Sequence, residues 1–381
     1  MRLHLRGALA VAVLSAACGK DSVGPKSPAD PQATTAQLQS LGSIFDVPAL
    51  NSLSAVSDSI TPTSAVVPAL QLAAASNPLM QSRLRPYAER IEGARVFTRL
   101  VPQMSVSRAA AAAALFPPAL LGKTFEWNFT ALRYDTTART GAPGTGVRFI
   151  LYAIDELTGS PAGPAPGVEV GYIDLMDETG SGNPKVHVIV AGVGGTPVYV
   201  DYTVTLASQS ATSVKITTAG YITNGASSPD SLRFNGAITL SGSPSSVSVT
   251  EDVSFDVNSH DIHVRNWQRV TFADPELSLR ISFRFEHAGE VVTLDGTLDV
   301  NESTHEVSGS VTSKVDGGLF ATCNVNGTSS SFTLTCTGAD DDGLNADEHA
   351  ALDALGEAAG NITSLFEGIL LPAIAVLAGA A

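Results

Sequence analysis

The feature that most constrains this chain is an alternation of apolar and polar residues that runs from about residue 124 to residue 337. A period of two places each set of side chains on its own face of a β-strand, so one face is buried and the other solvated. Short polar turns separate the strands, which favours an antiparallel meander of about fourteen strands. The clearest strand carries Leu277, Leu279, Ile281, Phe283 and Phe285. The sequence therefore predicts a mainly β domain over residues 122–338, and a sheet this large is expected to curve into a barrel or half-barrel.

Two early segments, 147–154 and 168–176, depart from the alternation because they are apolar on both faces. Strands of this kind are covered on both sides. The preceding region, 36–121, carries apolar residues such as Leu38 and Leu41 at helical spacing, which predicts several short helices. We expect these helices to cover the outside of the two strands.

The C-terminal segment, 339–381, carries an apolar stripe at helical spacing. Its helical length of about 50 Å is comparable with the width of about ten strands, so we expect it to pack across the apolar face of the sheet. Gly356, Gly360 and Pro372 are expected to bend or break it into two helical pieces.

Four glycines fall on the apolar face when the alternation is counted through their strands: Gly220, Gly236, Gly296 and Gly309. A glycine in the middle of a strand marks a bend or a close approach of another backbone. Two interpretations stay open, namely curvature of the sheet and docking of the C-terminal helix. Under the second, the glycines belong to a ligand-binding surface.

Glu251 also falls on the apolar face, between Val249 and Val253, if the alternation is unbroken. A buried carboxylate is costly unless it is paired. One interpretation is a β-bulge that turns Glu251 outward. The other is a polar group inside a ligand cavity.

Cys323 and Cys336 lie on the apolar faces of adjacent strands, on either side of a turn near residues 328–331. Side chains opposite each other across such a turn are close enough to form a disulfide, which would be structural. The alternative is a pair of buried free thiols.

Composition and motifs exclude several classes of function. The net charge of -15 would be repelled by phosphate, so no nucleic-acid partner is expected. No nucleophile motif, zinc-protease motif or phosphate-binding glycine loop occurs, so we expect neither an enzyme nor a cofactor.

No metal site is expected either. The acidic run 340–348 matches a calcium loop poorly, and capping of the following helix by Asn345 is the alternative to calcium binding. His260 and His263 are three residues apart in a strand, which places them on opposite faces where they cannot readily share a metal.

The pattern of the first 20 residues predicts an export signal. A basic start is followed by the apolar run 7–13 and by small residues immediately before Cys18. This segment resembles the lipobox of bacterial lipoproteins, although Ser15 stands where a leucine is usual. The resemblance implies that a signal peptide, 1–17, is removed and that Cys18 is lipidated. An ordinary secretory signal that leaves Cys18 free is the alternative.

The resemblance also implies a location in the cell envelope. Gly19 follows the cysteine where some inner-membrane lipoproteins have an aspartate, which favours the outer membrane, with the protein facing the periplasm or the exterior. Residues 18–35 are rich in proline, serine and aspartate, which predicts a flexible tether.

The expected layout is similar to that of bacterial half-barrel lipoproteins that carry lipids or lipidated proteins. It suggests a binding or carrier protein for an apolar small molecule or lipid. The alternative is a structural or protein-interaction lipoprotein with a solid core. Six arginines between positions 83 and 108 are interpreted either as a contact for anionic lipid headgroups or as partners of the acidic sheet exterior.

Overall fold

The computed structural model describes residues 26–43, 47–60, 114–155, 160–162, 167–210, 212–226, 231–243, 245–257, 261–328, 331–339 and 343–379. Several expectations fall outside these residues. They concern the signal peptide 1–17, Cys18, most of the helical region beyond residue 60, the arginines between 83 and 108, His260 and residues 340–342.

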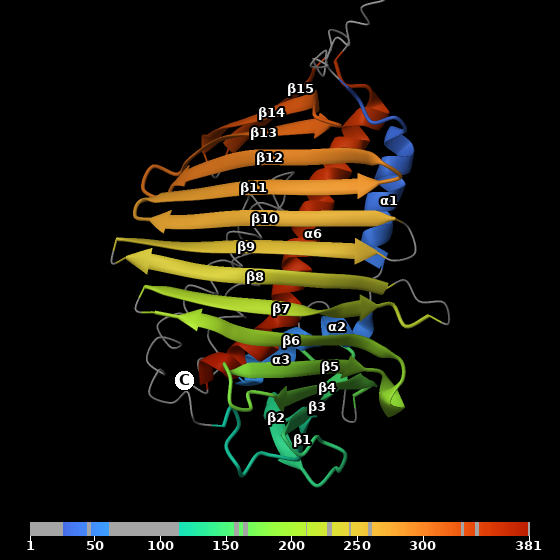
Figure 1. Ribbon diagram of the computed structural model, residues 1–381, viewed down its shortest axis with the longest axis vertical. Helices are drawn as coiled ribbons and strands as arrows, with labels where there is room; N and C mark the ends of the chain where they lie inside the picture. The colour runs from blue at the N-terminus through green and yellow to red at the C-terminus, as the bar shows by residue number, and fades with distance from the viewer. Residues whose placement is uncertain are drawn as a thin grey trace, which may run out of the picture.

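One sheet of 15 strands forms the body of the protein, in the order β15-β14-β13-β12-β11-β10-β9-β8-β7-β6-β5-β4-β3-β1-β2 (Figure 1). The strands are β1 (Lys123–Asn128), β2 (Arg133–Thr137), β3 (Gly146–Tyr152), β4 (Glu169–Asp177), β5 (Lys185–Ala191), β6 (Val198–Gln209), β7 (Ser213–Thr223), β8 (Ser231–Ser243), β9 (Ser246–Val257), β10 (Ile262–Ala273), β11 (Glu276–His287), β12 (Glu290–Asn301), β13 (Glu306–Val315), β14 (Gly318–Thr328) and β15 (Ser331–Gly338).

The mainly β meander expected from the sequence is confirmed. The sheet is open, because β15 and β2 stand at its two ends and do not pair with each other. The sheet has 15 strands, one more than the expected count of about fourteen. The β1–β2 hairpin is added beyond β3, and β1 pairs with β3 in parallel, whereas the other neighbouring strands are antiparallel.

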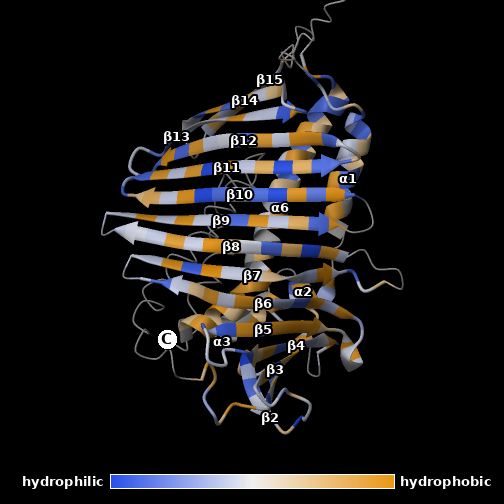
Figure 2. Ribbon diagram, in the orientation of Figure 1, coloured by the Kyte–Doolittle hydropathy of each residue, from blue (hydrophilic) through white to orange (hydrophobic). Residues whose placement is uncertain are grey.

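The alternation in sequence becomes an alternation in burial. In β11, Leu277, Leu279, Ile281, Phe283 and Phe285 are all at most 4% exposed, while the residues between them are half-buried or exposed. Figure 2 shows the same alternation along the middle strands. We call the face that carries these five side chains the inner face, and the opposite one the outer face.

The described helices are α1 (Pro31–Ser43), α2 (Pro48–Asn51), α3 (Leu53–Ile60), the 3₁₀ turn η3 (Val193–Gly195) and α6 (Ala346–Gly379). α6 is one continuous helix of 34 residues, so the expected break into two pieces is wrong. The loss of helix stability at Gly356 and Gly360 is small compared with the stabilisation from burial of the apolar stripe of α6. Pro372 lies in the last two turns, where the missing N–H removes a single bond to the carbonyl of Gly368.

A capping box starts α6. The side-chain oxygen of Asn345 accepts hydrogen bonds from the backbone N–H groups of Asp347 and Glu348, both at 3.0 Å. Glu348 accepts a bond from the N–H of Asn345 at 2.9 Å. This arrangement satisfies backbone donors that a helix start leaves unpaired. The expected capping of the helix by Asn345 is therefore confirmed.

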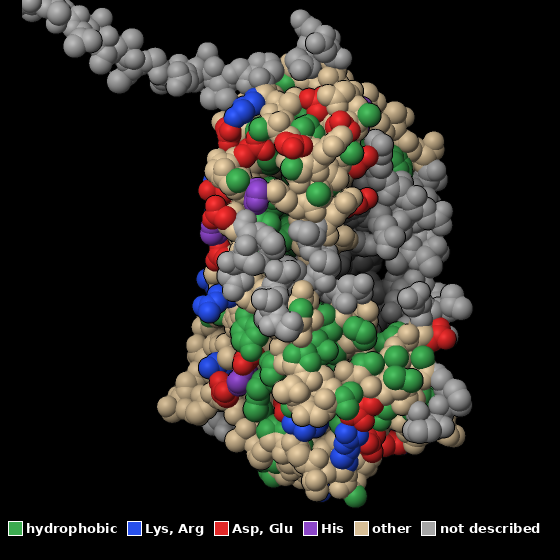
Figure 3. All heavy atoms as spheres, turned by 90° about the vertical axis from the view of Figure 1, so that its right-hand side faces the viewer, with side chains coloured by type: hydrophobic (Ala, Val, Ile, Leu, Met, Phe, Trp, Pro, Cys, Tyr) green, Lys and Arg blue, Asp and Glu red, His purple; other side chains and the backbone are tan. Residues whose placement is uncertain are grey.

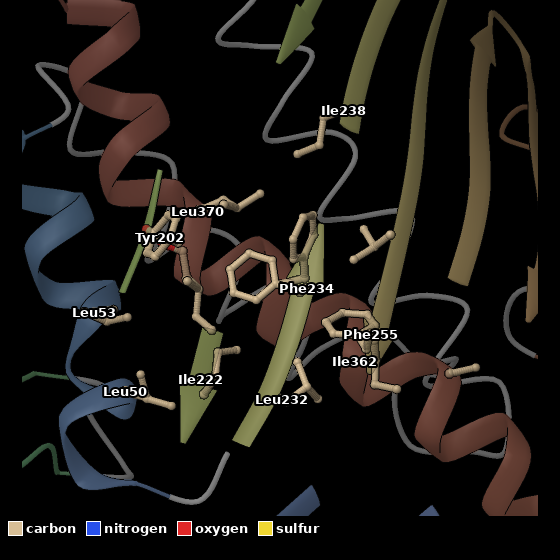
Figure 4. Close-up of a cluster of buried hydrophobic side chains, with 14 of the residues drawn as sticks. Leu50, Leu53, Tyr202, Ile222, Leu232, Phe234, Ile238, Phe255, Ile362 and Leu370 are labelled. Atoms are coloured by element: carbon tan, nitrogen blue, oxygen red, sulfur yellow. The ribbon is translucent and has the colours of Figure 1, made fainter. Parts of the chain in front are cut away.

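α6 packs against the inner face, which confirms its expected position (Figure 4). The ring of Phe366 lies edge-on to Phe234 and Phe255, with ring centroids 5.9 and 6.2 Å apart. The hydroxyl of Tyr202 donates to the carbonyl of Ile369, and burial raises the pKa of Tyr202. By length and composition α6 could cross a membrane, but 80% of its most apolar stretch is buried in the protein, as in a core helix.

The N-terminal helices lie on the inner side of the sheet, next to α6 (Figure 1). For α1, α2 and α3, which are the described helices of this region, the expectation that they cover the outside of the sheet is wrong. α1 and α3 both contact α6. Besides the apolar side that packs on the sheet, α6 has a second apolar side that these helices cover, and α1 buries Leu38 and Leu41. Ser52 donates its hydroxyl to the carbonyl of Tyr152 in β3 at 2.6 Å.

The expected tether 18–35 overlaps with ordered structure at its end. α1 already begins at Pro31. Lys26 forms an ion pair with Asp316, and its N–H donates to the carbonyl of Leu319 at 2.9 Å. Residues 26–35 therefore belong to the folded body.

Replacing Phe366 by alanine tests the docking of α6. The ring is 2% exposed, so its removal leaves a cavity and should lower the free energy of unfolding by about 3–5 kcal/mol. Urea denaturation followed by circular dichroism measures the change. Asn361→Ala, at an exposed position of the same helix, is the control. Equal shifts for both variants would contradict the packing described here.

Candidate functional site

Glu251 is buried in the inner face with 2% of its surface exposed. It pairs in unbroken register with Ile238 of β8 and Gln268 of β10. The bulge that would turn Glu251 outward is therefore absent, and that interpretation is wrong. The interpretation that remains is a polar group inside the apolar face.

Gln268 is the cross-strand partner of Glu251. Its amide nitrogen donates to a carboxylate oxygen of Glu251 at 2.9 Å. The amide oxygen, Oε1, is buried and has no hydrogen-bond partner, and the residue is 1% exposed. An unpaired buried acceptor costs about 1–3 kcal/mol, so this oxygen has capacity for a donor that the described residues do not supply.

Asn266 lies two residues before Gln268 on the same face of β10. Its side-chain nitrogen donates to the hydroxyl of Thr363 in α6 at 2.7 Å, and Thr363 in turn donates to the carbonyl of Ala359 at 3.0 Å. The Asn266 position is therefore bonded to α6. The Glu251–Gln268 pair occupies the next inward-facing position, two residues further along β10.

On the far side of this pair, the next row of the inner face is apolar. Val249, Val270, Leu279 and Leu298 pair in sequence across β9 to β12, and each is at most 4% exposed. The polar pair thus lies between the row that contacts α6 and a purely aliphatic row.

Gly236 is the glycine at which α6 docks. A Cβ atom at this position would lie 3.0 Å from the ring of Phe366 and 3.1 Å from a methyl of Val253. At Gly236, the absence of a side chain therefore makes room for α6, as the helix-docking interpretation expects.

The other three glycines mark close approaches within the sheet. A Cβ at Gly220 would lie 2.3 Å from the carbonyl oxygen of Asp201, and one at Gly309 would lie 2.3 Å from that of Thr297. At Gly296 the nearest atom would be a methyl of Val311, at 2.8 Å. At these three positions a Cβ would meet a neighbouring strand first, so they are not explained by the docking of α6.

Two of the pockets that described residues line bear on ligand binding. The pocket at Gly296, between Ile281 and Val311, holds only about 10 Å³, roughly one water molecule. The other lies between α1 and α6, measures about 160 Å³ and mixes apolar residues with Gln39, Glu357 and Asn361. Both are smaller than the several hundred Å³ of a typical ligand pocket.

Cys323 and Cys336 face each other in register on β14 and β15, and a disulfide joins them. This is the pairing expected from the sequence. The bond fastens the last strand to the sheet just before the chain enters α6.

His263 lies on the outer face, where one ring nitrogen is 2.6 Å from an oxygen of Asp256 and the other is 3.7 Å from Asp261. This hydrogen bond to Asp256 is the main cause that raises the pKa of His263 above its ordinary value. Among the described residues, no three His, Cys, Asp or Glu side chains come together as metal ligands would.

Sequence reasoning missed Asn266 and Gln268, although a signal was present. Both interrupt the apolar alternation of β10, which otherwise reads Ile262, Val264 and Val270 on its buried face. Two amides at consecutive inner positions of a central strand are the same kind of departure that drew attention to Glu251.

Comparison with known proteins assigns no family to this chain. No family model, no curated protein and no solved structure matches it. A proposal for the function therefore has to start from the buried Glu251–Gln268 pair and its surroundings.

The Asp256–His263 contact generates a pH prediction. Because the pKa of His263 is raised in the folded protein, its protonation favours folding below pH 6.5, and this contribution is lost as pH rises through the folded-state pKa. A nuclear magnetic resonance titration should give a midpoint above 6.5 for His263, and Asp256→Asn should lower it. A midpoint that Asp256→Asn leaves unchanged would contradict this cause.

Proposed function

We propose that this chain is a lipid-anchored extracytoplasmic binding or carrier protein, without catalytic activity, for a ligand with an apolar body and a hydrogen-bond donor. The buried, unpartnered oxygen of Gln268 carries the proposal. A hydroxyl or amino group of a ligand would satisfy this acceptor and recover the desolvation cost. An apolar ligand without a donor would leave that cost in place.

The surroundings of the pair suggest how such a ligand would lie. The donor group would meet Gln268 beside Glu251, and the apolar body would extend over the aliphatic row that contains Val270 and Leu279. The contacts that α6 makes through Phe366 with Phe255 and through Thr363 with Asn266 lie on the other side of the pair, and such a ligand would leave them in place.

The lipobox-like segment before Cys18 supports an anchored protein. Lipidation of Cys18 would attach the chain to a membrane, and Gly19 favours the outer one. The membrane is thus the partner that we propose first, and an apolar small molecule or lipid is the second.

A structural or protein-interaction lipoprotein with a solid core is the second candidate. The close packing along α6, where Phe366 contacts Phe234 and Phe255, favours it, as do the small pockets among the described residues. The two candidates differ in whether the inner face holds a molecule that the chain does not encode.

The carrier proposal is tested by native mass spectrometry of residues 19–381, purified without detergent, with solvent extraction of bound molecules. We expect a stoichiometric ligand that bears a hydroxyl or amino group. Gln268→Leu should weaken retention about tenfold, equivalent to about 1.4 kcal/mol.

Thr218→Val is the matched control, because Thr218 is another buried inner-face residue whose hydroxyl has no partner, and it lies on β7. It should leave ligand content unchanged. A ligand-free mass for the unaltered protein would favour the solid-cored alternative.

The anchor is tested separately. The full chain should partition into the membrane fraction and gain the mass of its lipid, whereas Cys18→Ser should be released into the soluble fraction. A Cys18→Ser protein that stays with the membrane would contradict lipidation as the anchor.

A further inference from the structure

Four arginines form a block on the outer face of the central sheet, and the register places like charges directly opposite each other. Arg265 of β10 pairs with Arg284 of β11, and Arg269 pairs with Arg280. All four are exposed. We call these residues the arginine block.

The two opposed pairs differ in how their charge is balanced. Arg265 makes a bidentate ion pair with Asp252 at 2.8 and 3.0 Å, and Arg284 pairs with Glu286 at 2.8 Å. The hydrogen bond of Arg269 goes instead to the neutral hydroxyl of Thr250, at 3.1 Å. Within the described part of the chain, neither Arg269 nor Arg280 forms an ion pair with a carboxylate.

Like charges directly opposite each other in a sheet destabilise it. The chain has 37 acidic and 22 basic residues, so carboxylates to balance these two guanidinium groups are abundant. Asp295 and Asp299 lie on the neighbouring β12, but they sit opposite Ser282 and Ser278 and pair with neither arginine. Among the described residues, Arg269 and Arg280 thus form a cationic pair in which neither guanidinium group has a direct ion pair, and an external anion placed between them would stabilise it.

The residues around this pair favour a sugar as the carrier of that anion. Trp267 is half-buried on the same face, between Arg265 and Arg269 along β10 and opposite Ser282. Hydroxyl groups flank the pair on both sides, from Thr250 on β9 and Thr297 on β12. An aromatic face packs on a sugar ring, hydroxyls bond its hydroxyls, and guanidinium groups bind carboxylate or sulfate in a bidentate manner.

We propose that the arginine block binds an acidic polysaccharide, with a carboxylate or sulfate between Arg269 and Arg280 and a sugar ring on Trp267. Figure 3 views the sheet edge-on, and charged side chains gather along its left margin, where the outer face lies. An anionic membrane fits less well, because the exposed large hydrophobic residues that are described, Leu132, Val168, Val193 and Leu319, lie outside this block.

This site is independent of the proposed carrier function, because its side chains stand on the opposite face of the sheet from Gln268. A ligand-free inner face would leave the proposal unaffected. Conversely, loss of polysaccharide binding would not remove an inner ligand.

The test uses residues 19–381 with polygalacturonate as the acidic probe, neutral dextran as the uncharged probe, and phosphatidylglycerol vesicles as the lipid probe. Calorimetry measures binding at low and high salt, and thermal unfolding is followed with and without polygalacturonate. The variant is Arg269→Ser/Arg280→Ser. The control, Lys123→Ser/Arg133→Ser, removes the same charge at exposed positions of β1 and β2.

We expect polygalacturonate to bind, neutral dextran not to bind, and added salt to weaken the binding. Arg269→Ser/Arg280→Ser should weaken it at least tenfold and, because it removes two opposed cations, should raise the unfolding temperature of the free protein. The control should bind as the unaltered protein does. Equal binding by both variants, equal loss in both, or binding to vesicles alone would overturn the proposal.

Discussion

The structure depends on covering one apolar face that a single sheet cannot bury by itself. Fifteen strands with inward side chains such as Phe234, Phe255 and Phe283 produce an aliphatic and aromatic surface far larger than a soluble protein can expose. α6 lies on this surface, and α1 and α3 pack beside it. The continuity of α6 through Pro372 follows from this requirement, because the burial along the helix outweighs one lost backbone hydrogen bond.

The sequence predicts the sheet well because its alternation is local. Leu277 to Phe285 can be assigned to one face without knowledge of any partner strand, and the disulfide follows from two such assignments. The side on which the N-terminal helices pack cannot be read in this way, since it depends on the second apolar side of α6, about 300 residues further along the chain. The parallel pairing of β1 with β3 is likewise not predicted by any local pattern, because the sequence of β1 does not indicate which edge of the sheet it joins.

The candidate site illustrates the same limit. Glu251 stands out in the sequence, but a carboxylate in an apolar strand has two physical solutions, to turn outward or to find a partner. The partner is Gln268, 17 residues later, and only the register of β9 and β10 brings the two together. Both proposed sites are places where the chain departs from its most stable arrangement, with an unpaired acceptor on the inner face and opposed cations on the outer one.

The meander also has a consequence for the order of folding. Most of its strands pair with their neighbours in sequence, so the sheet can grow by the addition of one hairpin at a time. The hydrogen bond between Tyr202 and Ile369 joins residues 167 positions apart, and α6 follows all 15 strands of the sheet in the sequence. Closure of the core must therefore wait until α6 has been added after the sheet, and until then the growing sheet exposes its apolar face. A chain of this design has most need of a chaperone late, between completion of the sheet and arrival of the helix.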